Sequence, residues 1–183
     1  MGLLLGISNE RKGLENVSVL VVTFLCNVTN FRPIALLPFI GKIFEKCISS
    51  RLLEYANRCN IFSSHQFGFL RGKSTQDAVI MLTEKIYDCL NGNDGSFCAN
   101  IFIDFQKAFD TIDHEILFNK MSSYGIKEKP LDLFRSFLTG RQQRVKIDDV
   151  ISSPKPLTIG LPQGSTLSAI LYLIYIFLEY KLY

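Results

Sequence analysis

Acidic side chains concentrate at residues 104–115, and the first of them is the group in this sequence best placed to do chemistry. Asp104 directly follows residues 97–103, a short, β-prone and almost uncharged run that predicts a buried central strand. An Asp that closes a buried strand is held rigidly while its oxygens reach solvent, as a Mg²⁺ ligand requires. The alternative is that Asp104 caps the following turn, and the strand pattern by itself favours this alternative.

A Gly- and Pro-rich loop at residues 160–165 is the second candidate for chemistry. Its sequence is Gly-Leu-Pro-Gln-Gly-Ser. The backbone amides of such a loop and the side chain of Gln163 could meet a nucleotide. Asp110 and Asp113 have a simpler interpretation as helix-start residues, because carboxylates there interact favourably with the helix dipole.

Two helices are expected before the acidic residues. Apolar residues at helical spacing predict an amphipathic helix over residues 40–57. Its expected buried stripe is Ile40, Ile43, Phe44, Cys47, Ile48, Leu52 and Leu53. Ser74 and Asp77 form a capping-box-like pair that opens a second helix, closed by Asn91 and Gly92. The buried stripe expected there is Ala78, Val79, Leu82, Ile86 and Leu90.

Four further elements are expected after the acidic residues. The first is a helix capped by Asp113 and ended by Gly125, and the second is a helix from Pro130 to Gly140. The third is a strand over residues 142–147 that turns at residues 148–149 and returns as far as Ile159. The fourth is an apolar helix from about Thr166. This order of helices and strands predicts an α+β fold. The first thirty residues show no clear period, so they are compatible with a strand without requiring one.

Composition and charge limit the class of protein. With 183 residues, 48% of them hydrophobic, the chain has material for one domain or a piece of a larger one, and low-complexity disorder is excluded. The net charge of +3 is small, but basic residues concentrate at residues 31–73 and 127–146, on either side of the acidic centre. Five cysteines without C-x-x-C spacing argue against a zinc site. The apolar runs are too short to span a bilayer, so we expect no membrane partner. Because the cysteines are best explained as reduced thiols and no secretory signal stands out, we expect an intracellular location, cytoplasmic or nuclear.

Four motifs occur in a fixed order along the chain. They are Phe31-Arg32-Pro33-Ile34, Gln66-Phe67-Gly68-Phe69 with Arg71-Gly72-Lys73-Ser74-Thr75, Phe102-Ile103-Asp104-Phe105-Gln106-Lys107-Ala108-Phe109-Asp110, and Gly160-Leu161-Pro162-Gln163-Gly164-Ser165. In this order and spacing they resemble the fingers and palm of a reverse transcriptase from a non-long-terminal-repeat retrotransposon of the jockey or LINE type. Four ordered motifs are far more specific than any one of them.

The resemblance implies an RNA-directed DNA polymerase domain that transfers deoxynucleotides to a primer by two-metal chemistry. The implied partners are an RNA template, a DNA primer and a deoxynucleoside triphosphate, and the implied cofactor is Mg²⁺. In this organisation residues 1–30 are an atypical N-terminal segment, residues 31–95 are partial fingers, and residues 96–183 are a partial ferredoxin-like palm.

The resemblance also implies roles for residues of the last two motifs. Asp104 matches the first metal-binding aspartate, and the backbone carbonyl of Phe105 matches its companion Mg²⁺ ligand. Phe109 matches the aromatic gate that packs under the sugar, with a core aromatic as the alternative. Gln163 and Gly164 match the motif that contacts the incoming nucleotide and the template.

Three basic residues complete the implied site. Arg32 matches the fingers arginine that binds the triphosphate, a role that suits the bidentate guanidinium group. Arg71 and Lys73 lie in a glycine-flanked loop and resemble contacts to the backbone of the template or primer. A solvated surface pair is the alternative explanation for these two residues.

One part of the family pattern is missing from this sequence. The family's catalytic centre also needs a Tyr-or-Phe, x, Asp, Asp turn, but after Gly164 the only carboxylate is Glu179. With Asp104 alone, two Mg²⁺ ions about 4 Å apart would repel each other without enough negative charge to hold them. We therefore expect a domain truncated before this turn, in which Mg²⁺ binding is doubtful and polymerisation by the isolated chain is not expected. The strand that ends at Ile103 would also lack a neighbour.

Two other hypotheses stay open. The chain could be a non-catalytic nucleic-acid-binding remnant that keeps the basic fingers surface. That hypothesis predicts salt-dependent RNA binding, weakened when Arg71 and Lys73 are changed together and indifferent to Asp104. The chain could also be a fragment that never folds stably, which cooperative unfolding of the purified chain would exclude.

Overall fold

A computed structural model of the chain describes residues 4–11, 14–21, 32–35, 37–91, 98–147 and 150–177. The chain divides into two compact units. One unit combines Met1–Ile61 with Lys107–Tyr183, and it contains the strands and most of the helices. The other unit is Phe62–Gln106 and contains the helix α2.

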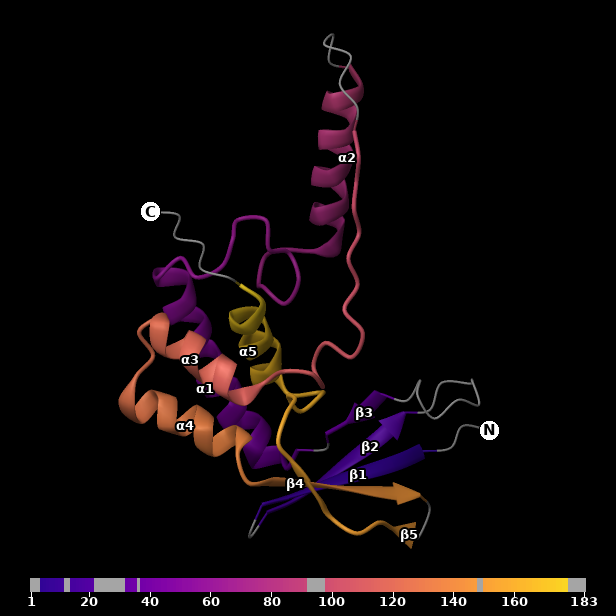
Figure 1. Ribbon diagram of the computed structural model, residues 1–183, viewed down its shortest axis with the longest axis vertical. Coiled ribbons are helices and arrows are strands. Elements are labelled where there is room, and N and C mark those ends of the chain that lie inside the picture. The colour runs from indigo at the N-terminus through magenta and orange to yellow at the C-terminus, as the bar shows by residue number, and fades with distance from the viewer. Residues whose placement is uncertain are drawn as a thin grey trace. The chain divides into compact units, whose positions relative to one another are not determined.

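The strands of the first unit form an antiparallel sheet (Figure 1). The strands are β1 Leu4–Arg11, β2 Leu14–Val21, β3 Arg32–Ile34, β4 Arg141–Ile147, β5 Val150–Ile151 and β6 Lys155–Leu157. Their order is β3-β2-β1-β4-β5, and β6 also pairs with β4. Much of the N-terminal segment, which carries no clear period, is therefore strand. The strand predicted over residues 142–147 is confirmed, whereas its turn at residues 148–149 lies outside the described residues.

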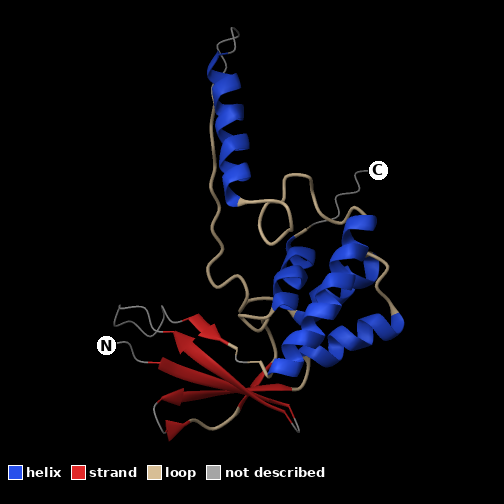
Figure 2. Cartoon of the chain, turned by 180° about the vertical axis from the view of Figure 1, so that it is seen from behind, coloured by secondary structure: helices blue, strands red, loops and turns tan. Residues whose placement is uncertain are grey.

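Four helices of the same unit pack together (Figure 2). They are α1 Phe39–Arg58, α3 His114–Ser123, α4 Glu128–Leu138 and α5 Thr166–Ile176. Helix α5 contacts α1 and α3, and α3 contacts α4. Their core includes Leu52, Ala56, Leu117, Phe118, Met121, Leu138, Leu167, Leu171, Leu173 and Ile174. The described helices include none that is both long and apolar enough to cross a membrane.

Local sequence signals set the ends of α3 and the start of α5 as predicted, whereas α4 begins at Glu128, two residues before the predicted Pro130. Asp113 caps α3, and its Oδ1 accepts a hydrogen bond of 3.0 Å from the backbone N–H of Ile116. Gly125 follows α3 in the left-handed conformation, with φ of +88°. Ser165 caps α5 by accepting a hydrogen bond of 3.2 Å from the N–H of Ser168. These ends depend on a few neighbouring residues, which explains why the sequence was sufficient to locate them.

The buried face of α1 differs from the predicted stripe. Ile40, Ile43 and Phe44 are exposed, whereas Glu45 and Ser49 are buried together with Leu52. Helix α5 packs against α1, and its first turn carries polar groups. Because these groups provide hydrogen-bond partners, two polar residues of α1 face inward and part of its apolar stripe faces outward.

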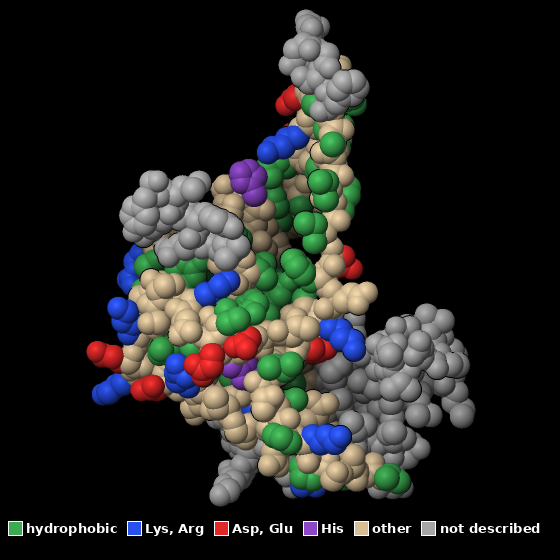
Figure 3. Space-filling model, in the orientation of Figure 1, with side chains coloured by type: hydrophobic (Ala, Val, Ile, Leu, Met, Phe, Trp, Pro, Cys, Tyr) green, Lys and Arg blue, Asp and Glu red, His purple; other side chains and the backbone are tan. Residues whose placement is uncertain are grey.

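The second unit contains α2 Thr75–Asn91, and the predicted capping box is confirmed. The N–H of Ser74 donates to Asp77 Oδ2 at 2.7 Å, and the N–H of Asp77 donates to Ser74 Oγ at 3.2 Å. The predicted buried stripe is wrong, because none of the residues of α2 is buried. Val79 and Leu90 are among its exposed apolar side chains, and Figure 3 shows hydrophobic atoms at the surface of this helix.

Residues 98–105 form neither helix nor strand. The side chains of Ile101, Phe102 and Ile103 are 86%, 79% and 76% exposed. The buried strand predicted there is therefore wrong for residues 98–103, and residue 97 lies outside the described part. A strand requires a neighbour that accepts and donates its backbone hydrogen bonds, and none of the described strands pairs with this segment.

Candidate functional site

Backbone hydrogen bonds join the Gly- and Pro-rich loop, residues 160–165, to the end of the motif at residues 102–110, which we call the acidic motif. The N–H of Leu161 donates to the carbonyl of Phe109, and the N–H of Gly160 donates to the carbonyl of Ile112, both at 2.7 Å. An isolated β-bridge between Asp113 and Ile159 continues this pairing. The fold therefore places residues 109–113 and 159–161, which are about fifty positions apart, side by side within one unit.

Gly160 makes the close approach between the two segments possible. It has φ of +87°, in the left-handed region that favours glycine. A Cβ atom at this position would lie 3.0 Å from the carbonyl oxygen of Asp110 and 3.1 Å from its Cα. Nε2 of the buried His114 also forms a hydrogen bond of 2.7 Å with the carbonyl oxygen of Gly160.

Gln163 is held at both its side chain and its backbone. Its Nε2 donates a hydrogen bond of 2.8 Å to Oδ1 of Asp110, and its carbonyl accepts one of 2.8 Å from the N–H of Ala35. Ala35 directly follows β3, the strand that carries Arg32, whose side chain lies outside the described part. Gly164 is exposed beside Gln163. The segment after β3, the end of the acidic motif and the loop therefore meet at Gln163.

Phe109 stacks on an aromatic residue of α5. Its ring centroid lies 4.9 Å from that of Tyr172, with 25° between the planes, and both residues are half-buried. This contact fixes the ring next to the Gln163 loop. The stacking is compatible with a core aromatic residue and also with an aromatic gate whose ring edge is available to a sugar. The role of Phe109 therefore stays a prediction.

Asp110 has a different position from the one predicted. It lies in a turn, three residues before the Asp113 cap, and its N–H donates to the carbonyl of Lys107 at 2.8 Å. The helix-start interpretation is therefore wrong for Asp110 and confirmed for Asp113. Sequence reasoning missed the contact of Asp110 with Gln163, and the only signal for it is the place of Asp110 at the end of the acidic motif.

A second carboxylate supports the loop from α1. Ser165 Oγ donates a hydrogen bond of 2.7 Å to Oε2 of Glu45, and both residues are buried. Ser49 Oγ lies 3.5 Å from Thr166 Oγ1, on the same two helices. Arg141, one of the basic residues at 127–146, is also buried. Glu45 is not part of the apolar stripe predicted for this helix, so helical periodicity does not predict its contact with Ser165.

Burial raises the pKa of the Glu45 carboxyl above its ordinary value of 4.5, although the Ser165 hydrogen bond and the charge of Arg141 act in the opposite direction. The folded chain therefore holds this proton to higher pH than the unfolded chain does. We expect the Glu45 contribution to stability to be largest below pH 4.5 and to fall as pH rises through the folded-state pKa. Urea unfolding across this pH range should show the fall in the unaltered chain but not in Glu45→Gln.

The matched control for this prediction is Glu54→Gln, which changes an exposed carboxyl of the same helix. Its pH profile should follow that of the unaltered chain. Comparing the two profiles removes the contribution of the other carboxyl groups. Parallel profiles for Glu45→Gln and the unaltered chain would contradict the assignment of a raised pKa to Glu45.

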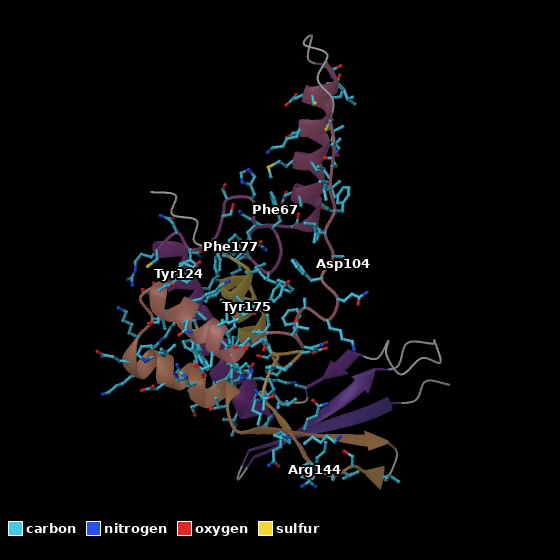
Figure 4. All side chains as sticks on the ribbon, viewed as in Figure 1. Phe67, Asp104, Tyr124, Arg144, Tyr175 and Phe177 are labelled. Atoms are coloured by element: carbon cyan, nitrogen blue, oxygen red, sulfur yellow. The ribbon has the colours of Figure 1, made fainter. Side chains whose placement is uncertain are left out.

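Asp104 lies on the extended segment of the second unit (Figure 4). Phe105 follows it in the same unit, and both residues are exposed. Among the described residues there is no group of three or more His, Cys, Asp or Glu side chains that could hold a metal ion. The described residues therefore do not fit a two-ion centre by themselves. Asp104 is a single candidate ligand that needs other carboxylates beside it.

The two basic residues of the second unit differ in their environment. Lys73 Nζ donates a hydrogen bond of 2.5 Å to the carbonyl of Ser64, and it lies 5.3 Å from the ring centroid of Phe67. The Lys73 side chain thus links the two ends of residues 64–73. Arg71 is exposed.

The loop at Gln163 and the mixed helix and sheet architecture are compatible with part of a nucleic-acid polymerase. A family model described as reverse transcriptase (RNA-dependent DNA polymerase) matches residues 23–177. The chain belongs to this family. Its relatives identify it more narrowly as a reverse transcriptase domain of the non-long-terminal-repeat retrotransposon type, as the motifs predicted.

Three relatives from Drosophila melanogaster illustrate the extent of the similarity. A protein of transposon BS is 34% identical over 152 residues, and one of the transposon X-element is 33% identical over 146 residues. The RNA-directed DNA polymerase from mobile element jockey is 32% identical over 149 residues. These matches cover 80%, 80% and 81% of this chain but 16% of each relative. The chain thus spans about one sixth of the length of the curated relatives it matches.

Proposed function

We propose that this chain supplies part of the nucleotide- and template-binding surface of an RNA-directed DNA polymerase, which extends a DNA primer on an RNA template. The observation that carries the proposal is the anchoring of Gln163 by Asp110 and Ala35. These two contacts join the Gln163 loop to the end of the third motif, at Asp110, and to the residue that follows the first motif, and all three positions belong to one unit. The exposed Gly164 next to it allows a ligand to approach the backbone closely.

In this proposal residues 31–95 belong to partial fingers and residues 96–183 to a partial palm, with residues 1–30 as an atypical N-terminal segment. Gln163 and Gly164 contact the incoming nucleotide and the template. Phe109 packs under the sugar, supported by its stacking on Tyr172. Arg32 binds the triphosphate, because a guanidinium group can bind phosphate oxygens in a bidentate manner.

In the same proposal the second unit supplies a carboxylate for metal binding and a basic side chain for nucleic-acid binding. The exposed carboxylate of Asp104 and the carbonyl of Phe105 are proposed as one part of a Mg²⁺ site that further carboxylates must complete. The exposed Arg71 is proposed to contact the phosphate backbone of the nucleic acid. Lys73 could contact the phosphate backbone only if it gave up its hydrogen bond with the Ser64 carbonyl. We therefore propose that Lys73 acts mainly by stabilising the conformation of its loop.

We expect the isolated chain not to extend a primer. The sequence after Gly164 lacks the Asp-Asp turn, and a single carboxylate does not offset the repulsion of two divalent ions. The measurement is extension of a labelled DNA primer on an RNA template with all four deoxynucleotides and Mg²⁺ or Mn²⁺. Extension above background that Asp104→Ala abolishes would contradict this expectation.

RNA binding by the same chain distinguishes the proposed surface from an inert fragment. We expect binding that weakens as salt rises, because contacts to phosphate release counterions. The change Arg71→Ala should weaken it, whereas Asp104→Ala should not. Binding that is independent of salt, or no binding at all, would overturn the proposed function.

A further inference from the structure

We propose that Asp110 is a positioning residue, whose carboxylate holds the side-chain amide of Gln163 in one of its two orientations. The loop then meets its nucleotide or template ligand with the carboxamide oxygen of Gln163 facing away from Asp110. This inference rests on the proposed function of the Gln163 loop and deepens it, because it states which polar group the loop presents.

The chemistry of the pair determines the orientation. A Gln carboxamide has a donor end and an acceptor end of nearly equal shape, so a flip exchanges them at little steric cost. An ionised carboxylate only accepts hydrogen bonds. Nε2 of Gln163 must therefore face Oδ1 of Asp110, across the observed 2.8 Å. Within the described part of the chain, no group donates a hydrogen bond to the Oε1 of Gln163.

Asp110 is itself held in place. Its N–H bonds to the carbonyl of Lys107 at 2.8 Å, and its backbone packs so closely against Gly160 that a Cβ there would lie within 3.2 Å of three of its atoms. The backbone of Gln163 is fixed by Ala35. With both partners held, little conformational entropy is lost when a ligand binds to the oriented amide.

The side-chain bond is not needed to join the two segments. The hydrogen bonds of Gly160 with Ile112 and of Leu161 with Phe109 already do so through the backbone. What the bond between Asp110 and Gln163 adds is the direction of the carboxamide. If this bond served only to join the loops, a partner for Gln163 that accepts either end of the amide would be sufficient. A carboxylate accepts only the NH₂ end, so it also sets the orientation.

The first experiment uses NMR on the ¹⁵N-labelled chain without ligand. The Gln163 side-chain NH₂ signals, identified by their loss in Gln163→Ala, should show one strongly hydrogen-bonded proton. In Asp110→Ala they should move to the positions of a solvent-exposed Gln, and in Asp110→Asn to intermediate positions, because Asn accepts without a charge and permits both orientations. The control Asp132→Asn, an exposed acid in α4, should leave them unchanged. Identical signals in the unaltered chain and in Asp110→Ala would overturn the inference.

The second experiment measures binding of an RNA-template and DNA-primer duplex with dTTP, by fluorescence anisotropy at fixed salt. We expect Asp110→Ala and Gln163→Ala each to weaken binding about tenfold, the size of one hydrogen bond to a charged group, and the double variant to be no weaker than Gln163→Ala. Additive losses would overturn the inference while leaving the role of Gln163 intact.

The two experiments separate failure of the inference from failure of the proposed function. If Gln163→Ala binds as tightly as the unaltered chain, the proposed role of the loop fails, whatever the NMR signals show. If Asp110→Ala does not fold, which thermal unfolding reveals, Asp110→Asn decides the question. Full binding by Asp110→Asn with unchanged amide signals would then also count against the inference.

Discussion

Replacing Phe118 by alanine is expected to lower the free energy of unfolding by about 3–5 kcal/mol, the range for a large aromatic removed from a packed core. Phe118 lies in α3 and is fully buried. The guanidinium carbon of Arg135 lies 4.4 Å from the centroid of the Phe118 ring. The centroid of the His114 ring lies 6.3 Å from the same point. Because a small domain has about 5–15 kcal/mol of stability in total, this loss should be visible as a large shift of the urea midpoint.

The matched control is Phe39→Ala, because Phe39 is in α1 of the same unit and is 77% exposed. We expect its effect to stay within about 0.5 kcal/mol. The pair also tests whether the chain folds, since a chain without a fixed core would respond equally to both changes. Non-cooperative unfolding of the unaltered chain would favour the hypothesis of an unstable fragment.

Gly160→Ala is expected to destabilise the chain by about 2–5 kcal/mol through two separate effects. Alanine at φ of +87° carries the cost of the left-handed conformation, about 1–2 kcal/mol. Its Cβ would also lie 3.0 Å from the carbonyl oxygen of Asp110, and this neighbour is backbone that moves only at a cost, about 1–3 kcal/mol for overpacking. Urea unfolding of the purified variant measures the sum.

Gly140→Ala isolates the conformational effect. Gly140 has φ of +68°, and an added Cβ would meet no atom within 4 Å. We expect this variant to lose about 1–2 kcal/mol, the conformational cost alone. Equal losses at the two glycines would show that the approach of Gly160 to Asp110 is not as close as described. A larger loss at Gly160 should also disturb the Gln163 side-chain signals, because Asp110 is their hydrogen-bond partner.

The family and several helix ends could be predicted from the amino-acid sequence alone. Four ordered motifs identified a reverse transcriptase domain, since their order and spacing are too specific to arise from composition. The caps at Ser74 and Asp113 and the stop at Gly125 followed from the residues present, because each depends on hydrogen bonds or dihedral angles within a few positions.

The buried faces of the helices and the contacts of the Gln163 loop depend on packing between segments that are far apart in the chain, so the sequence did not predict them. Periodicity reports which residues are apolar and not which neighbour covers them, so it predicted a buried Ile40 and left Glu45 out of the buried stripe. In the structure Ile40 is exposed, and the hydroxyl of Ser165 gives the buried Glu45 a hydrogen-bond partner. The same limit applies to residues 98–103, because an apolar run becomes a buried strand only where another strand pairs with it. The contact between Asp110 and Gln163 joins residues 53 positions apart, and no local pattern encodes a hydrogen bond that the packing of two loops creates.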